Sequence, residues 1–342
     1  MGILINICRK NKDQISKNKN ERKNVVEKTL IFFHQIDGKK KEMDLAGQDA
    51  YDIITNELGE DVKYFAVYDG HGIKGKEASQ LVRYEIRNKL IEDKKTIQNF
   101  KYKNEVEEYF SALYKHIQKK TTKRSTDYEI SGSCAISVLI VDGKIYVINC
   151  GDSRAVLGTK LKEKKVALEM SIDHKPTRED EVKRINESNG EVTDKYSGVP
   201  RVYLKNDDTP GLAVSRSIGD LVAHKCGVTY DPEVIEKEID QDDAFIIIGS
   251  DGIWDAMGST EAVGFVFKAL ENGKRDLSAS HLVEECRNRW ELMNLFKQKF
   301  QFELFQNRET NQDNLGVKPK DFNQNSYSID DITSIIYFFS ND

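Results

Sequence analysis

The sequence predicts an α+β fold built in layers, with largely antiparallel sheets. Apolar runs rich in Val, Ile and Phe predict strands at 28–36, 62–68, 133–158, 244–250 and 332–339. Helical stripes of apolar residues lie between these runs, but without the regular alternation of a parallel βαβ fold. The chain has 342 residues, 38% of them hydrophobic and 32% charged, which is typical of a globular protein without a membrane-spanning stretch.

The first half of the chain is expected to contain two strands followed by two helices. After the strand over 28–36 comes a Gly-Lys turn and a polar stretch that ends at 46–53, and then the strand over 62–68. The first helix follows residue 75 and has an apolar face made of Ala78, Leu81, Val82, Ile86 and Leu90. The second helix is expected over 104–120, with a stripe made of Val106, Phe110, Leu113 and Ile117.

The second half begins with the clearest local pattern, a hairpin over 133–158. Two β-branched runs flank Asp142-Gly143, the strongest short signal for a hairpin turn. A helix is expected to start with Thr177 as its N-cap and to end before Gly190. The remaining segments are an irregular loop at 191–211, a buried strand at 244–250, helices near 260–272 and 277–295, a polar loop at 306–328 and a strand at 332–339.

Charge is spread unevenly along the chain. The first 41 residues hold eleven Lys or Arg and four Asp or Glu, although the net charge of the whole chain is −5. The remainder is therefore acidic, which argues against nucleic acid as a partner. The five cysteines include no C-x-x-C pair, so neither a disulfide framework nor a zinc site is expected. Cys134 and Cys150 lie in apolar runs and are interpreted as core residues.

The stretch from Gly70 to Gly75 matches the G-x-G-x-x-G fingerprint of dinucleotide-binding proteins. Two features argue against this interpretation. Asp69 directly precedes the first glycine and would repel a pyrophosphate. The acidic residues about twenty positions on, Glu92 and Asp93, end a helix rather than a second strand. No nucleotide cofactor is therefore expected.

Four apolar strands each have an Asp at one end, namely Asp69, Asp152, Asp251 and Asp330. A single Asp in such a place ordinarily accepts hydrogen bonds from turn N–H groups. Four of them leave two interpretations open, either separate turns or a carboxylate cluster at one rim of a sheet. A cluster would stay ionised only with cations, because neighbouring carboxylates raise one another's pKa. Oxygen ligands favour Mg²⁺ or Mn²⁺ over zinc.

Six stretches, in this order, resemble the metal-dependent serine/threonine protein phosphatases of the type 2C family: YFAVYDGHG, SGSCAISVLIVDGKIYVINCGDSRAVL, DHKPTREDEVKRINESNGEV, GLAVSRSIGD, FIIIGSDGIWDAM and DDITSIIYFF. The resemblance runs from about residue 28 to 340. It implies a central β-sandwich of two antiparallel sheets flanked by helices on both sides, with the metals at one end. It places a catalytic domain over 28–342, with a variable flap near 191–211. Residues 1–27 are polar and rich in Asn and Lys, so they are expected to form a basic, disordered arm.

The activity implied by the resemblance is hydrolysis of phosphoserine and phosphothreonine in phosphorylated proteins by a hydroxide that bridges two metals. Two divalent cations, Mg²⁺ or Mn²⁺, are implied, with a third that binds more weakly. By motif position, His71 resembles the general acid and Asp69 the bridging carboxylate. The other implied metal ligands are the Gly70 carbonyl, Asp251, Asp330 and Asp49, and for the third metal Asp152 and Asp255.

The chain departs from the family pattern in three places. The first motif has Gln48-Asp49 where Glu-Asp is usual, so Asp49 is the expected participant. The usual phosphate-binding Arg is Asp44, and Lys39, Lys40 or Lys41 are the candidates to replace it. The last motif has Asp331 where Asn is common, which is a mild change.

Three other motif residues are expected to be structural rather than catalytic. His174 in the DHKP motif resembles a turn residue of the family. Arg216 and Asp220 in SRSIGD are expected to brace their loop by an ion pair with each other.

The N-terminus suggests a membrane tether. Met1-Gly2 begins a myristoylation-like motif, although the usual Ser or Thr at the sixth position is Asn6. Cys8 is a candidate for palmitoylation, and nearby basic residues favour an anionic membrane. A plain disordered arm is the alternative. No secretory signal is visible, so a cytoplasmic monomer is expected, either free or tethered.

Two further functions compete with the phosphatase. One is a catalytically dead relative that binds phosphoproteins as a scaffold, and the other is hydrolysis of small phosphorylated metabolites. Dead members usually lose metal carboxylates, whereas this chain keeps Asp69, Asp251 and Asp330.

Overall fold

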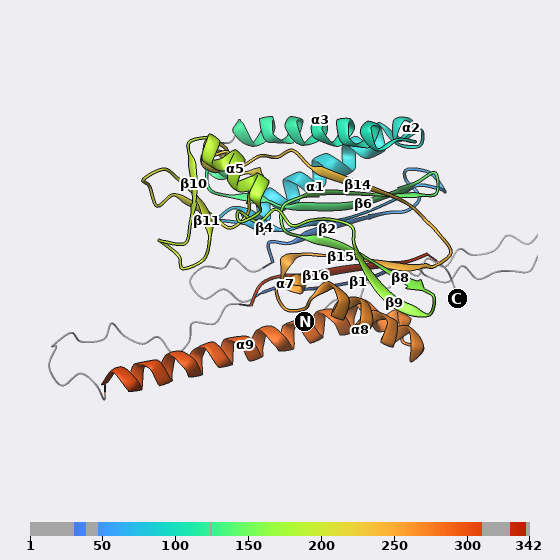
Figure 1. Ribbon diagram of the computed structural model, residues 1–342. Coiled ribbons are helices and arrows are strands. Elements are labelled where there is room, and N and C mark those ends of the chain that lie inside the picture. The colour runs from blue at the N-terminus through green and yellow to red at the C-terminus, as the bar shows by residue number, and fades with distance from the viewer. Residues whose placement is uncertain (1–30, 39–46, 124, 310–328, 340–342) are drawn as a thin grey trace, which may run out of the picture.

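The computed structural model describes residues 31–38, 47–123, 125–309 and 329–339. Two five-stranded antiparallel sheets lie face to face, and helices cover both outer faces (Figure 1). The first sheet has the order β14-β7-β6-β3-β2, which are Glu233–Glu238, Lys144–Cys150, Ala135–Val141, Lys63–Tyr68 and Ala50–Ile54. The second has the order β1-β16-β15-β8-β9, which are Ile31–Ile36, Ile332–Phe338, Asp243–Gly249, Arg154–Leu161 and Lys164–Glu169. The predicted α-β-β-α sandwich is confirmed.

Two long helices cover each sheet (Figure 1). The first sheet packs against α1 (Gly75–Glu92) and α3 (Lys103–Thr122), and the second against α8 (Ser259–Glu271) and α9 (Ser278–Glu309). The short helices are α2 (Lys94–Ile97), α4 (Ser125–Tyr128), α5 (Glu179–Glu187), α6 (Leu221–His224), α7 (Asp251–Trp254) and the 3₁₀ turn η1 (Arg275–Leu277). Among the helices of the described residues, none has both the length and the apolar character needed to cross a membrane.

The central strands are buried on both faces. In β3, Phe65 and Val67 point into the space between the sheets, while Tyr64, Ala66 and Tyr68 face α1 and α3. A strand covered on both sides needs apolar residues at every position, which explains why its sequence is an unbroken apolar run. The same reasoning applies to β15 and β16, which face the other sheet on one side and α8 and α9 on the other.

The expected hairpin is confirmed and joins β6 to β7. Asp142 and Gly143 both have positive φ angles, of 52° and 72°, and Val141 pairs with Lys144 on either side of them. Two consecutive left-handed residues give the turn whose twist matches that of the flanking strands.

The expected N-cap of the helix after the DHKP motif was wrong. The helix α5 begins at Glu179, its N-cap is Arg178 and no side chain caps it, while Thr177 is exposed. Three acidic residues occupy the first turn of this helix, where the helix dipole favours negative charge. Their interaction with the dipole stabilises the start of the helix without a hydroxyl cap.

The sequence pattern did not predict β9 and β14, and it missed shorter strands in two further segments. Residues 191–211, expected as an irregular loop, contribute to a small sheet made of β10 (Gly190–Thr193), β11 (Arg201–Leu204) and β12 (Pro210–Leu212). The strand β2 lies at the end of the stretch expected to be polar. These shorter strands have three to five residues, too few for the alternation of buried and exposed positions to stand out in the sequence.

A fourth, very small sheet has the order β13-β5-β4, which are Ile218–Gly219, Gly132–Ser133 and Gly70–His71. Its strand β4 begins directly after Asp69. Several sequence predictions lie outside the described residues: the arm over 1–27 with Gly2 and Cys8, the lysines at 39–41, Asp44, and residues 310–328 of the expected loop. Residues 306–309 belong to α9.

Candidate metal centre and catalytic site

The sheet topology brings the strand-end aspartates to one end of the sandwich. Both β3 and β7 run antiparallel to β6, so the C-terminal ends of β3 and β7 lie at the same end of the first sheet. In the second sheet β15 ends beside the start of β16. One carboxylate oxygen from each of Asp69, Asp152 and Asp251 lies within 4.8 Å of the others. Of the two interpretations left open, the structure therefore favours a cluster over separate turns.

The carboxylates of this cluster repel one another strongly. Desolvation, and after it the charges of Asp251 and other neighbours, raises the pKa of Asp69 well above its usual range. Desolvation and then Asp330 and Asp152 raise the pKa of Asp251 in the same way. The pKa of Asp255 is also raised, chiefly by desolvation, although Lys175 opposes the rise. A bound cation would remove this repulsion.

Asp49 lies beside the cluster and is only 4% exposed. Its Oδ2 accepts a hydrogen bond of 2.6 Å from the Thr333 hydroxyl, whereas its buried Oδ1 has no hydrogen-bond partner among the described residues. Burial, and then the charge of Asp331, raises the pKa of Asp49 to about 7. A buried carboxylate oxygen without a donor, next to other hard oxygen ligands, fits Mg²⁺ or Mn²⁺. The residues of the site therefore suit the implied metals.

Gln48 and Asp331, two of the departures from the family pattern, hold the loops of the site. Gln48 Nε2 donates to the Gly72 carbonyl at 2.7 Å. Asp331 is buried and accepts from the N–H groups of Gly38 and Gly47 through Oδ1 and from that of Gln48 through Oδ2. An Asn has a single acceptor oxygen and would leave one side of this arrangement without an acceptor. Asp331 therefore ties the first motif to the last.

Gly70 is required by the packing of the backbone around it. A Cβ at this position would lie 2.2 Å from the Gly75 carbonyl oxygen and 2.7 Å from that of Gln48. Gly72 has a φ of 82°, which side chains rarely adopt. The chain thus turns sharply between β3 and α1, and the role of the Gly70 carbonyl as a metal ligand stays a prediction.

His71 contacts Asp220, the residue that the sequence analysis paired with Arg216. Its Nε2 lies 2.6 Å from Oδ2 of Asp220, a buried residue. Arg216 instead bonds Glu181 and Glu233. The expected ion pair between Arg216 and Asp220 was therefore wrong, because residues four apart in this non-helical segment point toward different neighbours.

Lys175 and Cys134 both contact Asp152. Lys175, which the sequence pattern did not single out, places Nζ 2.5 Å from Asp152 Oδ2. The Cys134 thiol donates to Asp152 Oδ1 at 3.4 Å, and desolvation raises the pKa of this thiol well above its usual range. Cys134 and Cys150 are both buried, as expected of core residues. A thiol with a raised pKa is a poor nucleophile.

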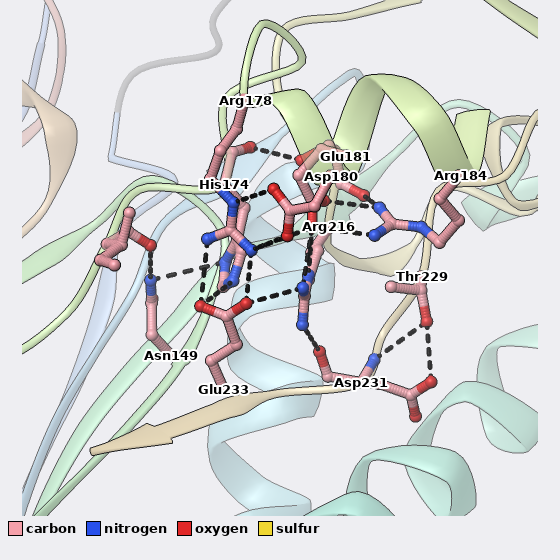
Figure 2. A network of polar contacts seen from close by, with 12 residues as sticks. Asn149, His174, Arg178, Asp180, Glu181, Arg184, Arg216, Thr229, Asp231 and Glu233 are labelled. Atoms are coloured by element: carbon pink, nitrogen blue, oxygen red, sulfur yellow. Dashed lines mark hydrogen bonds and ion pairs between the residues drawn. The ribbon is translucent and has the colours of Figure 1, made fainter. Parts of the chain in front are cut away.

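A second acidic group, made of Asp180, Glu181 and Glu233, also has oxygens within 4.8 Å of one another but lies in a different environment (Figure 2). Arg184 Nη2 lies 2.5 Å from a Glu181 oxygen, and Arg216 Nη2 lies 2.7 Å from Glu181 and 2.8 Å from Glu233. Burial by itself would raise the pKa of Glu181, but hydrogen bonds from these arginines lower it to about 2. The arginines already compensate these carboxylates, so this group is an ion-pair network rather than a metal site.

The network also encloses His174, which is fully buried (Figure 2). Its Nδ1 lies 3.0 Å from the Gly151 nitrogen, and its backbone carbonyl accepts from the Ser215 N–H. Burial lowers the pKa of His174, which favours the neutral ring. The structural role expected for this residue agrees with these contacts.

Replacing Glu181 with glutamine is expected to lower the free energy of unfolding by about 3 kcal/mol, because the fully buried carboxylate is a charged partner of two partly buried arginines, Arg184 and Arg216. The pKa of Glu181 is depressed in the folded state, so its stabilisation is present above about pH 4.5 and is lost as the pH falls toward 2. Urea unfolding at pH 7 and pH 3 measures both effects. The matched control is Glu187→Gln on the same helix, at an exposed side chain. Equal stability of the two variants at pH 7 would contradict the assignment.

Comparison with known proteins identifies one family. The model of the family described as "Protein phosphatase 2C" matches residues 29–291. "Probable protein phosphatase 2C 35" of Arabidopsis thaliana is 32% identical over 244 residues, which cover 65% of this chain and 68% of the relative. "Probable protein phosphatase 2C 64" of Oryza sativa subsp. japonica is 34% identical over 229 residues, covering 66% of this chain but 53% of the relative. The chain thus spans between half and about two thirds of these relatives.

Solved structures share the fold at low sequence identity. The serine-threonine phosphatase 2C from Toxoplasma gondii superposes with a TM-score of 0.67 at 19% identity, over 90% of this chain and 94% of that one. A sex determining protein of C. elegans gives a TM-score of 0.64, also at 19% identity, over 90% of this chain and 64% of that one. These similarities support the sandwich architecture.

Proposed function

Because this chain belongs to the protein phosphatase 2C family of serine/threonine phosphatases, we propose that it hydrolyses phosphoserine and phosphothreonine in proteins by direct attack of a metal-bridging hydroxide. The main support is the convergence of Asp69, Asp152 and Asp251 from three separate strands on one spot. Burial and neighbouring carboxylates raise the pKa values of Asp69 and Asp251, and bound divalent cations would stabilise their ionised forms.

We assign the carboxylates to two sets by their motif positions. Asp69, Asp251, Asp330 and Asp49 would hold two ions, with Asp69 shared between them. Asp152 and Asp255 would hold a third, weaker ion. When bound, such ions lower the pKa of a shared water and neutralise the charge of the phosphoryl group. Mg²⁺ and Mn²⁺ both suit this set of hard oxygen ligands.

His71 is the proposed general acid. It follows Asp69 by two positions, and its side chain is about a quarter exposed, so a substrate can reach it. The alkoxide of Ser or Thr is a poor leaving group, and a proton from the imidazole would let it depart as an alcohol. The buried thiols of Cys134 and Cys150 take no part in this scheme, and no phospho-enzyme is expected.

The test is release of phosphate from a phosphothreonine peptide with Mn²⁺, with Mg²⁺ and with a chelator. We expect turnover with either ion and none with the chelator. A protein that binds the phosphopeptide but releases no phosphate with either ion would be the scaffold instead. Faster release from a sugar phosphate than from the peptide would favour small metabolites as substrates.

A further inference from the structure

The small sheet β13-β5-β4 joins two distant parts of the chain next to the acidic cluster. Gly132 in its central strand pairs with His71 on one side and with Gly219 on the other. Asp220 follows Gly219 directly. The sheet therefore brings the His71 ring and the Asp220 carboxylate into contact across 149 positions of sequence, with 2.6 Å between Nε2 and Oδ2.

Asp220 is held in place from several directions. The Ser217 hydroxyl donates to its Oδ2 at 2.6 Å, and its own N–H donates to the Ser131 carbonyl at 2.9 Å. Gln118 of α3 clamps the preceding Gly219 through two hydrogen bonds of 2.8 Å. The backbone of Asp220 is left-handed, with a φ of 44°, a conformation that residues other than glycine keep only when their surroundings impose it. The carboxylate is thus a fixed point against which a ring can be oriented.

The central strand leaves room for this contact only because it carries a glycine. A Cβ at Gly132 would lie 2.2 Å from Asp220 Oδ2 and 2.7 Å from the Ile218 carbonyl oxygen. The side chains of His71 and Asp220 contact each other in the space next to Gly132 that a side chain would otherwise fill. The contact is therefore built by three segments, none of which lies near another in the sequence.

We propose that Asp220 is a positioning residue that fixes the imidazole of His71 for proton delivery. This inference rests on the proposed function. Asp220 accepts a hydrogen bond from Nε2, so the proton that is transferred comes from Nδ1. Before the transfer the ring carries a proton on both nitrogens and is positively charged. As the hydroxide oxygen bonds to phosphorus and the P–O bond to Ser or Thr breaks, the Nδ1 proton passes to the departing oxygen. The ring thereby becomes neutral, keeps its Nε2 proton on the hydrogen bond to Asp220, and later regains a proton from solvent. A fixed ring avoids the entropic cost of orienting the acid at each turnover.

Asp220→Asn tests the proposal with two substrates. We expect kcat for a phosphothreonine peptide to fall about 10- to 100-fold, a part of the 10²- to 10⁴-fold that a general acid typically supplies. With p-nitrophenyl phosphate, whose leaving group needs no proton, kcat should change less than about threefold. The double variant with His71→Ala should lose no more than His71→Ala alone, because the two residues act as a unit. Asp242→Asn, at an exposed side chain, is the matched control.

Ser217→Ala is a second variant that keeps the carboxylate and removes one of its hydrogen bonds. It should show the same selective loss on the peptide, but a smaller one. A readout that needs no metal is ¹⁵N NMR of labelled histidines in chelator, with His71 assigned by its absence from His71→Ala. We expect a signal from the hydrogen-bonded Nε2 proton of His71 in the original chain, and we expect this signal to disappear in Asp220→Asn.

Three outcomes would overturn the positioning role while phosphatase activity persists. These are equal slowing with both substrates, additive losses in the double variant, and an unchanged His71 ring signal in Asp220→Asn. If the original chain releases phosphate from neither substrate, the proposed function itself fails and the inference fails with it.

Discussion

Replacing Asp251 with asparagine is expected to reduce Mn²⁺-dependent phosphate release from a phosphothreonine peptide by more than about 100-fold. Even residues that only support metal ligands typically contribute 10- to 100-fold, so loss of a direct ligand should cost more. Asp251 begins α7 immediately after β15 and shares the 4.8 Å cluster with Asp69 and Asp152. Asparagine keeps the shape of the side chain but removes its charge. Steady-state kinetics at saturating Mn²⁺ gives the measurement.

The same substitution should have the opposite effect on the stability of the metal-free protein. The pKa of Asp251 is raised in the folded state, so its ionised form costs stability at neutral pH when no cation is bound. A neutral Asn removes this cost. In chelator we expect the melting temperature of Asp251→Asn to exceed that of the original chain by a few degrees, and the rise on adding Mn²⁺ to shrink. Asp242→Asn should leave both unchanged, and full activity in Asp251→Asn would refute the ligand assignment.

Replacing His71 with alanine is expected to lower kcat for a phosphothreonine peptide by about 10²- to 10⁴-fold, the range typical of general acid catalysis. Hydrolysis of p-nitrophenyl phosphate should be slowed far less, because nitrophenolate leaves without a proton. The ratio of the two rates therefore isolates proton donation from any general disturbance of the site. Single-turnover measurements would separate this step from product release.

His116→Ala is the matched control for this experiment, because the His116 side chain is exposed on the surface of α3. It should leave both rates unchanged. If His71→Ala slows the two substrates to the same extent, the ring supports the loop rather than donating a proton.

The central strands were accessible from the sequence because burial on both faces requires an unbroken apolar run, whereas the two-sheet sandwich was implied by the resemblance to a family. The strand β15 (FIIIG within Asp243–Gly249) and the strand β16 (Ile332–Phe338) are examples. The β6–β7 turn was equally predictable, because left-handed φ angles restrict its residues to types such as Asp and Gly. The sequence also showed that aspartates stand at the ends of the apolar runs, but it did not show whether these aspartates lie close together in space.

Short elements and long-range polar partners were not predictable. The strands of residues 190–212 are too short to show a period, and they are stabilised by packing on Ile185 and Cys226 from neighbouring segments. The partner of Arg216 was wrong because the choice of a carboxylate depends on how α5 and β14 pack, and both Glu181 and Glu233 come from those elements. No local signal links His71 to Asp220.

By itself, the sequence determined which segments are buried, where the chain turns, and that acidic side chains stand at the ends of buried strands, since solvent exclusion and backbone sterics act locally. The tertiary structure decided which of those side chains face one another, and it gave two similarly compact acidic groups different neighbours. Around Glu181 arginines supply the positive charge, whereas around Asp69 and Asp251 the carboxylates outnumber the nearby lysine. Electrostatic energy depends on distance and solvent access in space, and neither is encoded in the order of residues alone.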